Sequence, residues 1–269
     1  MSFLLDGVMA VTWQQIVMYV VGIVLIWLAV KKEYEPSLLL PMGFGAILVN
    51  LPFSGVIDQV VQGKVEAAGI IQWLFESGIE ASEAMPILLF IGIGAMIDFG
   101  PLLSQPVLFL FGAAAQFGIF AAIVIACLMG FDLKDAASIG IIGAADGPTS
   151  ILVSQVLDSN YMGPIAVAAY SYMALVPIIQ PFAIKLVTTH KERSIHMEYN
   201  PKSVNKALRI SFPIAVTIIV GFISPQSVAL VGFLMFGNLL RECGVLNSLS
   251  QAAQNELANI ITLLLGITI

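Results

Sequence analysis

The sequence predicts an all-α polytopic membrane protein, and three observations carry that prediction. Of the 269 residues, 59% are hydrophobic and only 10% are charged, whereas about a quarter of the residues in a soluble protein are charged. Apolar runs long enough to enter or cross a bilayer recur along the chain. Glycine, which is more frequent in membrane helices than in soluble ones, occurs 23 times. This composition excludes a soluble enzyme, and no nucleic-acid partner is expected.

The apolar segments define the expected helices. A complete crossing needs about 20 apolar residues, and residues 11–30 and 106–130 meet that length. Residues 37–53 are marginal because Pro41 and Gly43 interrupt them. In chain order the segments are 11–30, 37–53, 86–97, 106–130, 137–156, 163–184, 210–223, 226–240 and 257–269. We expect them to form one membrane domain over residues 1–269, with broken or re-entrant helices among them.

Two polar stretches divide this domain. Residues 56–85 carry apolar side chains at helical spacing and charged ones between them, an amphipathic pattern that suits either an interfacial helix on the outer face or a helical loop domain. Residues 185–209 hold six of the eleven basic residues, so the positive-inside rule makes this loop cytoplasmic. Those six residues are Lys185, Lys191, Arg193, Lys202, Lys206 and Arg209.

The stretch "SIGIIGAADGPTSIL" (138–152) places a carboxylate, Asp146, between apolar runs. A charged side chain at membrane depth costs a few kcal/mol, so such residues usually line a cavity or bind a ligand. Gly147 and Pro148 follow directly, and proline removes a helical N–H and clashes with the preceding turn. We therefore expect the helix to break here and to leave backbone carbonyls available. Transporters coordinate Na⁺ or H⁺ with broken helices of this kind.

The oxygen atoms near the predicted break suit a small hard cation. Asp146 supplies a carboxylate, and Thr149, Ser150 and Ser154 supply hydroxyls, whereas His190 and His196 lie in the basic loop without a zinc-like spacing. The sequence thus predicts Asp146, Thr149 and Ser150 as Na⁺ ligands. A plainer alternative is that Asp146 only caps a helix that starts at Pro148. The two roles are compatible.

Other polar residues have a functional and a structural interpretation. Tyr172, in "AYSYMALVP" beside Ser171, offers a hydroxyl at membrane depth or packs as an interfacial tyrosine. Asp98, in "GAMIDFGPLL", is a helix cap at a membrane boundary or faces the ion path. Asn238 and Glu242, in "GNLLRECG", join helices through hydrogen bonds more readily than they bind an ion.

Four motifs carry a resemblance to a known family. "IGIGAMIDFGPLL", "IGIIGAADGPTSI", "YSYMALVPIIQP" and "FGNLLRECGV…AAQNELANIITLLLG" resemble the beta subunit of biotin-dependent, sodium-pumping decarboxylases, which act on oxaloacetate, methylmalonyl-CoA, glutaconyl-CoA or malonate. The resemblance implies a multi-pass protein of the bacterial inner membrane that decarboxylates carboxybiotin and couples this reaction to Na⁺ export. It also implies that Asp146 is a Na⁺ ligand and that Tyr172 belongs to the ion path, which makes these two the predicted catalytic residues.

The resemblance also implies partners and a missing part. A biotin-carrier subunit, a carboxyltransferase alpha subunit and a small membrane anchor subunit are expected, together with homo-oligomerisation, because this chain has no biotin-acceptor motif of its own. Family members continue beyond residue 269, and residues 257–269 are too short to cross. We therefore expect one half of an inverted-repeat fold, with the second repeat missing and no pumping by this form alone.

Two other classes of function stay open at this stage. A secondary Na⁺-coupled carboxylate transporter would use the same broken helix without chemistry, and a membrane scaffold would have no activity. Avidin sensitivity of Na⁺ flux separates the decarboxylase from both.

A count of crossings predicts how the Asp146 segment enters the membrane. Lys31 and Lys32 place the end of the first span inside, and the basic loop 185–209 must also be inside. The number of membrane crossings between these two cytoplasmic segments is consistent only if residues 137–156 enter from the outer face and return to it. Asp146 would then lie at the tip of this segment. Lys134 and Ser159 would then lie on the same side of the membrane.

Overall fold

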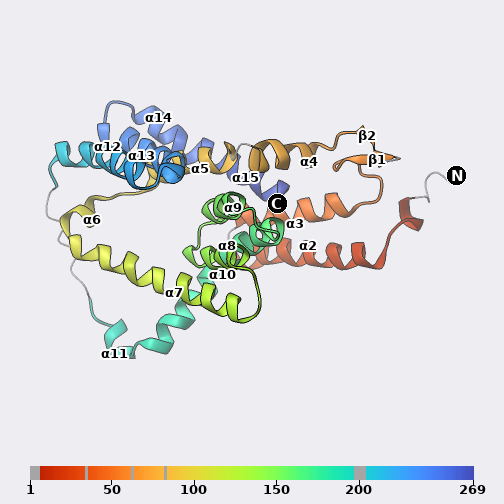
Figure 1. Cartoon of the computed structure of the whole chain (residues 1–269), viewed down its shortest axis with the longest axis horizontal. Helices are drawn as coiled ribbons and strands as arrows, with labels where there is room; N and C mark the ends of the chain where they lie inside the picture. The colour runs from red at the N-terminus through yellow and green to blue at the C-terminus, as the bar shows by residue number, and fades with distance from the viewer. Residues whose placement is uncertain (1–6, 34–35, 62–63, 82–83, 197–203) are drawn as a thin grey trace. The chain divides into compact units, whose positions relative to one another are not determined.

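The computed structural model describes residues 7–33, 36–61, 64–81, 84–196 and 204–269 (Figure 1). These residues are almost entirely helical, which confirms the predicted class. They form two compact units, Met1–Pro86 with Asn259–Ile269, and Ile87–Ala258. The sequence predicts one membrane domain, and the grouping of both units into one domain stays a prediction, as does the inverted repeat.

Among the described residues, three helices are long and apolar enough to cross a membrane: Trp13–Lys32 (α2), Pro106–Leu128 and Lys206–Ile223 (α12). The first begins with a capping box in which the Thr12 hydroxyl accepts the N–H of Gln15 while the Gln15 side chain accepts the N–H of Thr12. It ends at Lys31 and Lys32, whose positive charges suit the negative end of the helix dipole.

The first unit is built on two closely packed helices, α2 and α3 (Pro36–Asn50). A Cβ atom added to Gly22 would lie 2.6 Å from the carbonyl oxygen of Gly43, so the two backbones touch. The sequence predicts an interruption at Pro41 and Gly43. That prediction is wrong, because α3 runs unbroken through both residues and Gly43 serves the helix contact. The end of α15 (Ala258–Thr268) packs on the other side of α3 near Gly45.

Residues 56–85 differ from the predicted helical pattern in their first half. A two-stranded antiparallel hairpin, β1 (Gln59–Val61) and β2 (Lys64–Ala67), pairs Val60 with Val65. β-branched residues favour strands, and here they outweigh the helical spacing. The second half is helical, with α4 (Ile70–Phe75) and a π-helical turn (Glu76–Glu80). Residues 62–63 and 82–83 of this stretch lie outside the described residues, and its predicted outer location stays a prediction.

One part of the second unit is a helical cluster made by α5 (Ala84–Met96), α12 and α13 (Val228–Cys243). α12 and α13 pack together across a 3₁₀ turn (Pro225–Ser227). α5 and α13 approach to backbone contact, because a Cβ atom on Gly94 would lie 1.8 Å from Leu234 O. A Cβ atom on Gly237 would lie 2.0 Å from Ile91 O. The short helices α6 (Gly100–Ser104) and α14 (Asn247–Ala252) flank this cluster, and a π-helical segment (Ala253–Leu257) leads from α14 into α15.

The rest of the second unit surrounds Asp146. The 3₁₀ turn Pro106–Leu108 leads into α7 (Phe109–Leu128), which packs on α8 (Leu133–Gly140). A 3₁₀ turn (Ile141–Ala144) and α9 (Gly147–Val156) follow, and α9 packs on α10 (Met162–Val187).

The basic loop is shorter than predicted. Lys185 still belongs to α10, and Lys206 and Arg209 lie inside α12, because both helices extend into the polar stretch. The short helix α11 (His190–Arg193) occupies part of the remainder. Lys202 lies outside the described residues.

Candidate functional site

The helix breaks where the sequence predicts, immediately before Gly147 and Pro148. The 3₁₀ turn Ile141–Ala144 ends at Ala145, whose φ of 54° and ψ of 40° put it in the left-handed region. A non-glycine residue pays about 1 kcal/mol or more for this conformation. Asp146 is extended, with φ of −135° and ψ of 105°, and α9 starts at Gly147. Strain of this kind often marks a functional site, and here it turns the chain at the predicted ion ligand.

The Asp146 carboxylate lies at the N-terminus of α9 and interacts with the third residue of that helix. The Thr149 hydroxyl donates a hydrogen bond to Asp146 Oδ2. Among the described residues, nothing forms an ion pair with Asp146. The hydrogen bond from Thr149 and the positive end of the α9 dipole both favour this charge.

Two buried serines continue along α9 from Asp146. Ser150 Oγ donates to the Asp146 carbonyl oxygen over 2.8 Å, and Ser154 Oγ donates to the Ser150 carbonyl oxygen over 2.7 Å. Both side chains are 0% exposed. Each hydroxyl has a single proton, which these bonds use, so its remaining lone pairs act only as acceptors. Acceptor oxygens are what a bound cation requires.

The plainer interpretation of Asp146 as a helix cap agrees with its backbone conformation, since it is the residue before the first turn of α9. A cap alone does not call for a negative charge, because serine or asparagine satisfies the same N–H groups. Capping and ion binding therefore remain compatible at this position.

Asp98 sits at a second helix break, and its environment is different. Its Oδ1 accepts the N–H of Gly100, the first residue of α6, over 2.8 Å, although Phe99 and not Asp98 directly precedes that helix. The same oxygen lies 3.0 Å from Arg209 Nη2, and Arg241 Nη2 lies 3.8 Å from Oδ2. Two guanidinium groups thus compensate this carboxylate. Asp98 is poorly suited to bind a cation, in contrast to Asp146.

The polar residues of α13 join helices, as the sequence predicts. Asn238 is 1% exposed, and its amide donates to Ile97 O over 2.9 Å, beyond the last turn of α5. Glu242 Oε2 lies 2.7 Å from Arg209 Nε and so ties α13 to α12. Arg241 Nη1 donates to Met96 O over 2.6 Å. From the sequence, Arg209 was named only as part of the basic loop and Arg241 was not named, because the partners of both are distant along the chain.

The chain on either side of Asp146 folds back on itself. Ser159 Oγ donates to Asp135 Oδ1 over 2.8 Å, and the N–H of Asn160 donates to the same oxygen over 3.0 Å. α8 and α9 also contact each other, and Figure 1 shows both at the same end of α7. The start of α8 and the end of α9 therefore meet at one place. This is the hairpin geometry that the count of crossings predicts, with Asp146 at the turn.

Cysteine labelling tests the placement of this hairpin in the membrane. In a background without Cys127 and Cys243, single Lys134→Cys and Asp158→Cys variants should both react with an impermeant reagent added outside. Asp158 is exposed and avoids the engaged Ser159 hydroxyl. Lys191→Cys, in the basic loop, should react only after the membrane is permeabilised. Labelling of positions 134 and 158 from opposite sides would make α8 and α9 an ordinary broken span.

Tyr172 lies on α10, the helix that packs on α9, and its side chain is partly exposed. Within the described residues it forms no hydrogen bond with Asp146. The structure thus brings the helices of the two predicted catalytic residues together, while direct contact between their side chains stays a prediction.

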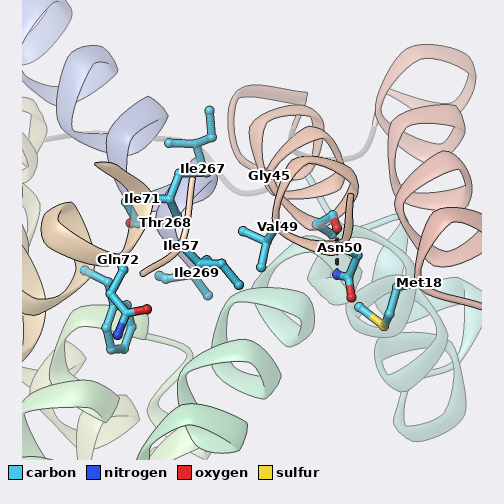
Figure 2. Close-up of a pocket in the computed structure, with 12 residues that line it drawn as sticks. Met18, Gly45, Val49, Asn50, Ile57, Ile71, Gln72, Ile267, Thr268 and Ile269 are labelled. Carbon is cyan, nitrogen blue, oxygen red and sulfur yellow. Dashed lines mark hydrogen bonds between the residues drawn. The ribbon is translucent and has the colours of Figure 1, made fainter. Parts of the chain in front are cut away.

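A cavity of about 400 Å³ lies in the first unit, between α3, α4 and the last residues of the chain (Figure 2). Its polar side chains include Asn50, whose amide donates to Ala46 O over 2.8 Å, and Gln72. None of its lining residues is charged. This cavity offers no carboxylate for a cation, so the break at Asp146 is the better candidate for the functional site.

Comparison with known proteins agrees with the motifs. Residues 14–269 match the family model of the Na⁺-transporting oxaloacetate decarboxylase beta subunit. The methylmalonyl-CoA decarboxylase subunit beta of Propionigenium modestum is 48% identical over 94% of this chain and 68% of the relative. The glutaconyl-CoA decarboxylase subunit beta of Acidaminococcus fermentans is 46% identical over 97% of this chain and 67% of the relative. A probable oxaloacetate decarboxylase beta chain of Vibrio cholerae is 41% identical over 98% of this chain and 73% of the relative.

These relatives are longer than the chain, yet the match extends over nearly all of its residues. The match to the family model extends over residues 14–269, and the apolar helices of the structure agree with a membrane subunit. This chain belongs to the family of beta subunits of Na⁺-transporting decarboxylases.

Proposed function

We propose that this chain is the membrane subunit that decarboxylates carboxybiotin and couples the reaction to Na⁺ export. The observation that supports the coupling role most directly is the charge of Asp146. It lies between α8 and α9, which fold back on each other, and no cationic side chain of the described residues pairs with it. A carboxylate kept at membrane depth without a protein counter-charge is best explained by a cation that binds there.

We assign Asp146, Thr149 and Ser150 as the Na⁺ ligands of this chain. Asp146 supplies the charge, and the two hydroxyl oxygens lie on the first turn of α9 and are oriented by hydrogen bonds to Asp146. Oxygen donors of this kind suit a hard cation. Tyr172 is the proposed second residue of the ion path, because its helix packs against α9.

The proposed coupling is energetically reasonable. Transfer of one elementary charge against 100 mV costs about 2.3 kcal/mol, so a favourable decarboxylation is able to drive the export of an ion. Binding of Na⁺ at Asp146 has to alternate between the two sides of the membrane as carboxybiotin loses CO₂. This chain supplies the ion site, and the biotin is supplied by a partner.

Beta subunits function within multi-subunit complexes, and we propose three partners for this one. A biotin-carrier subunit delivers the carboxyl group, a carboxyltransferase alpha subunit loads it, and a small membrane anchor subunit joins these proteins to the membrane. The Na⁺-binding chain itself forms a homo-oligomer in this proposal.

We propose further that the complex uses a CoA ester rather than oxaloacetate. The relatives from CoA-ester decarboxylases are 46–48% identical to this chain, whereas those from oxaloacetate decarboxylases are 38–41% identical. The Vibrio cholerae alignment extends over 316 positions, more than the 269 residues here, so that relative carries segments that this chain lacks. The alignment with the Veillonella parvula CoA-ester relative covers 261 positions.

Na⁺ uptake into proteoliposomes that contain the complete native complex tests both proposals. Uptake should start on addition of methylmalonyl-CoA or glutaconyl-CoA and should stop when avidin is present. Substrate-independent uptake that avidin does not inhibit would favour a secondary transporter and refute the decarboxylase. Avidin-sensitive uptake driven by oxaloacetate alone would keep the decarboxylase and refute the CoA-ester assignment.

A further inference from the structure

A buried carboxylate, Asp135, joins the start of α8 to the end of α9, at the base of the hairpin that these two helices form. Its Oδ1 accepts Ser159 Oγ over 2.8 Å and Asn160 N over 3.0 Å, and its Oδ2 accepts Asn160 Nδ2 over 3.3 Å. The residue is 5% exposed. Three donors from one short segment thus converge on a single side chain, which we call the hairpin latch (Asp135, Ser159 and Asn160).

The position of Asp135 in its helix makes this arrangement unusual. Asp132 precedes the first residue of α8, so Asp135 is the third residue of the helix. An acidic residue at that position commonly reaches back to the N–H of the capping residue. Glu192 does so in this chain, where it accepts the N–H of Thr189 over 2.7 Å. Asp135 instead binds residues 24 and 25 positions further along the chain.

The end of α9 is shaped to present the donors. Asp158 adopts a left-handed conformation with φ of 52°, its N–H donates to Gln155 O over 3.0 Å, and Ser159 N donates to Ser154 O over 2.9 Å. These two bonds form a Schellman motif, which ends the helix and turns the chain. The turn directs Ser159 and Asn160 toward Asp135. Phe131 and Tyr161 add an edge-on ring contact with centroids 5.6 Å apart.

The hydrogen bonds of the latch favour the ionised carboxylate of Asp135. The hydrogen bond from Ser159 is the main cause that lowers the pKa of Asp135 below its usual range, and the bonds from Asn160 act in the same direction. A lowered folded-state pKa means that the contribution of the group to stability is present above the ordinary carboxyl range. It is lost only as the pH falls through the lowered value.

We propose that Asp135 is a positioning residue that holds the Asp146 break in its ion-binding geometry. The proposal rests on the assigned role of Asp146. α8 and α9 have 8 and 10 residues, and helices this short are marginally stable alone. The strained turn at Ala145 persists only if the surrounding structure enforces it. The latch joins the two arms at their base, where it adds three hydrogen bonds to the ring contact of Phe131 and Tyr161.

The test uses the complete complex with Asp135→Asn, Ser159→Ala and the double variant, and Asp132→Asn is the matched control. Asp132 is an exposed carboxylate three residues away, and its side chain does not cap α8. The Na⁺ concentration for half-maximal decarboxylation should rise by roughly tenfold in Asp135→Asn, the size typical of residues that orient metal ligands. Ser159→Ala should show a smaller rise. Asp135→Asn keeps one acceptor oxygen for Ser159 and Asn160, whereas Ser159→Ala removes one donor. The double variant should therefore show a larger rise than either single variant, and a rise smaller than the two combined, because both changes act on one cluster.

Hydrogen–deuterium exchange of residues 147–156 provides a second readout that does not depend on activity. Exchange should be faster in Asp135→Asn than in Asp132→Asn. If Asp135→Asn fails to assemble, Ser159→Ala is compared with Asp132→Asn in both the Na⁺ half-saturation and the exchange measurement. Unchanged Na⁺ half-saturation, or equal effects of the two aspartate variants, would overturn the latch. A native complex without any Na⁺ response would refute the proposed function instead, while the exchange data would still report on the latch.

Discussion

Asp146→Asn should abolish Na⁺-stimulated decarboxylation while the complex still assembles. The change keeps the shape of the side chain and a helix-capping oxygen, but it removes the negative charge at the break. No cationic side chain of the described residues depends on that charge, so the fold should be retained. We expect Na⁺ affinity to fall by about 100-fold or more, which corresponds to about 2.7 kcal/mol. The measurement is the Na⁺ dependence of decarboxylation by the purified complex.

Asp98→Asn is the matched control for this experiment. It changes the other aspartate that precedes a Gly-Pro pair, and that aspartate is already paired with Arg209 at 3.0 Å. Arg209 keeps its contact with Glu242 in the variant, so the Na⁺ half-saturation should stay within a factor of about 2, since exposed ion pairs contribute little. Near-normal Na⁺ activation in Asp146→Asn, or an equal loss in Asp98→Asn, would remove Asp146 from the ion site.

Gly237→Ala should prevent stable folding of the second unit. A Cβ atom at this position would lie 2.0 Å from Ile91 O and 2.9 Å from Ala95 N, and both contacts are with backbone. Backbone cannot rotate away as a side chain does, so α5 and α13 would have to separate. Overpacking usually costs 1–3 kcal/mol, and we expect about 3 kcal/mol or more here. The measurement is the fraction of the variant that elutes as a monodisperse species in detergent, together with its thermal midpoint.

Gly118→Ala is the control for Gly237→Ala. Gly118 lies within α7 and is also a helical glycine, but a Cβ atom added there would meet nothing within 4 Å. Alanine favours a helix over glycine by about 1 kcal/mol, so this variant should be as stable as the parent or slightly more stable. Equal monodispersity and equal thermal midpoints for the two variants would show that the close helix contact at Gly237 is not required for stable folding.

The sequence predicted the membrane class and the helix break at Asp146 because the signals for both are local. The apolar segments and the terminal lysines of α2 identify a membrane protein, since the bilayer requires long apolar helices. The Gly-Pro pair after Asp146 predicted the helix break, because proline acts on its own turn of the chain. The crossing count predicted that residues 137–156 fold back on themselves, and α8 and α9 do so, while their placement in the membrane stays a prediction.

The predictions from the sequence were wrong where one stretch carries signals for two different structures. Residues 59–67 have apolar side chains at helical spacing, but their valines favour strands, and the hairpin forms. The sequence predicted an interruption at Gly43, but this glycine allows close contact with the backbone of α2. A glycine that weakens a helix and a glycine at a helix contact cannot be told apart from the sequence alone.

Only the tertiary structure decided which carboxylates are available to a cation. Asp98 and Asp146 are each followed closely by a Gly-Pro pair, and the sequence left open whether Asp98 caps a helix or faces the ion path. Arg209 reaches Asp98 from 111 positions further along the chain, and Ser159 reaches Asp135 from 24 positions away. Local propensities and hydropathy act over a few residues, so they determined the helices and the position of the break. Charge compensation depends on distances in space, and those exist only once the helices have packed.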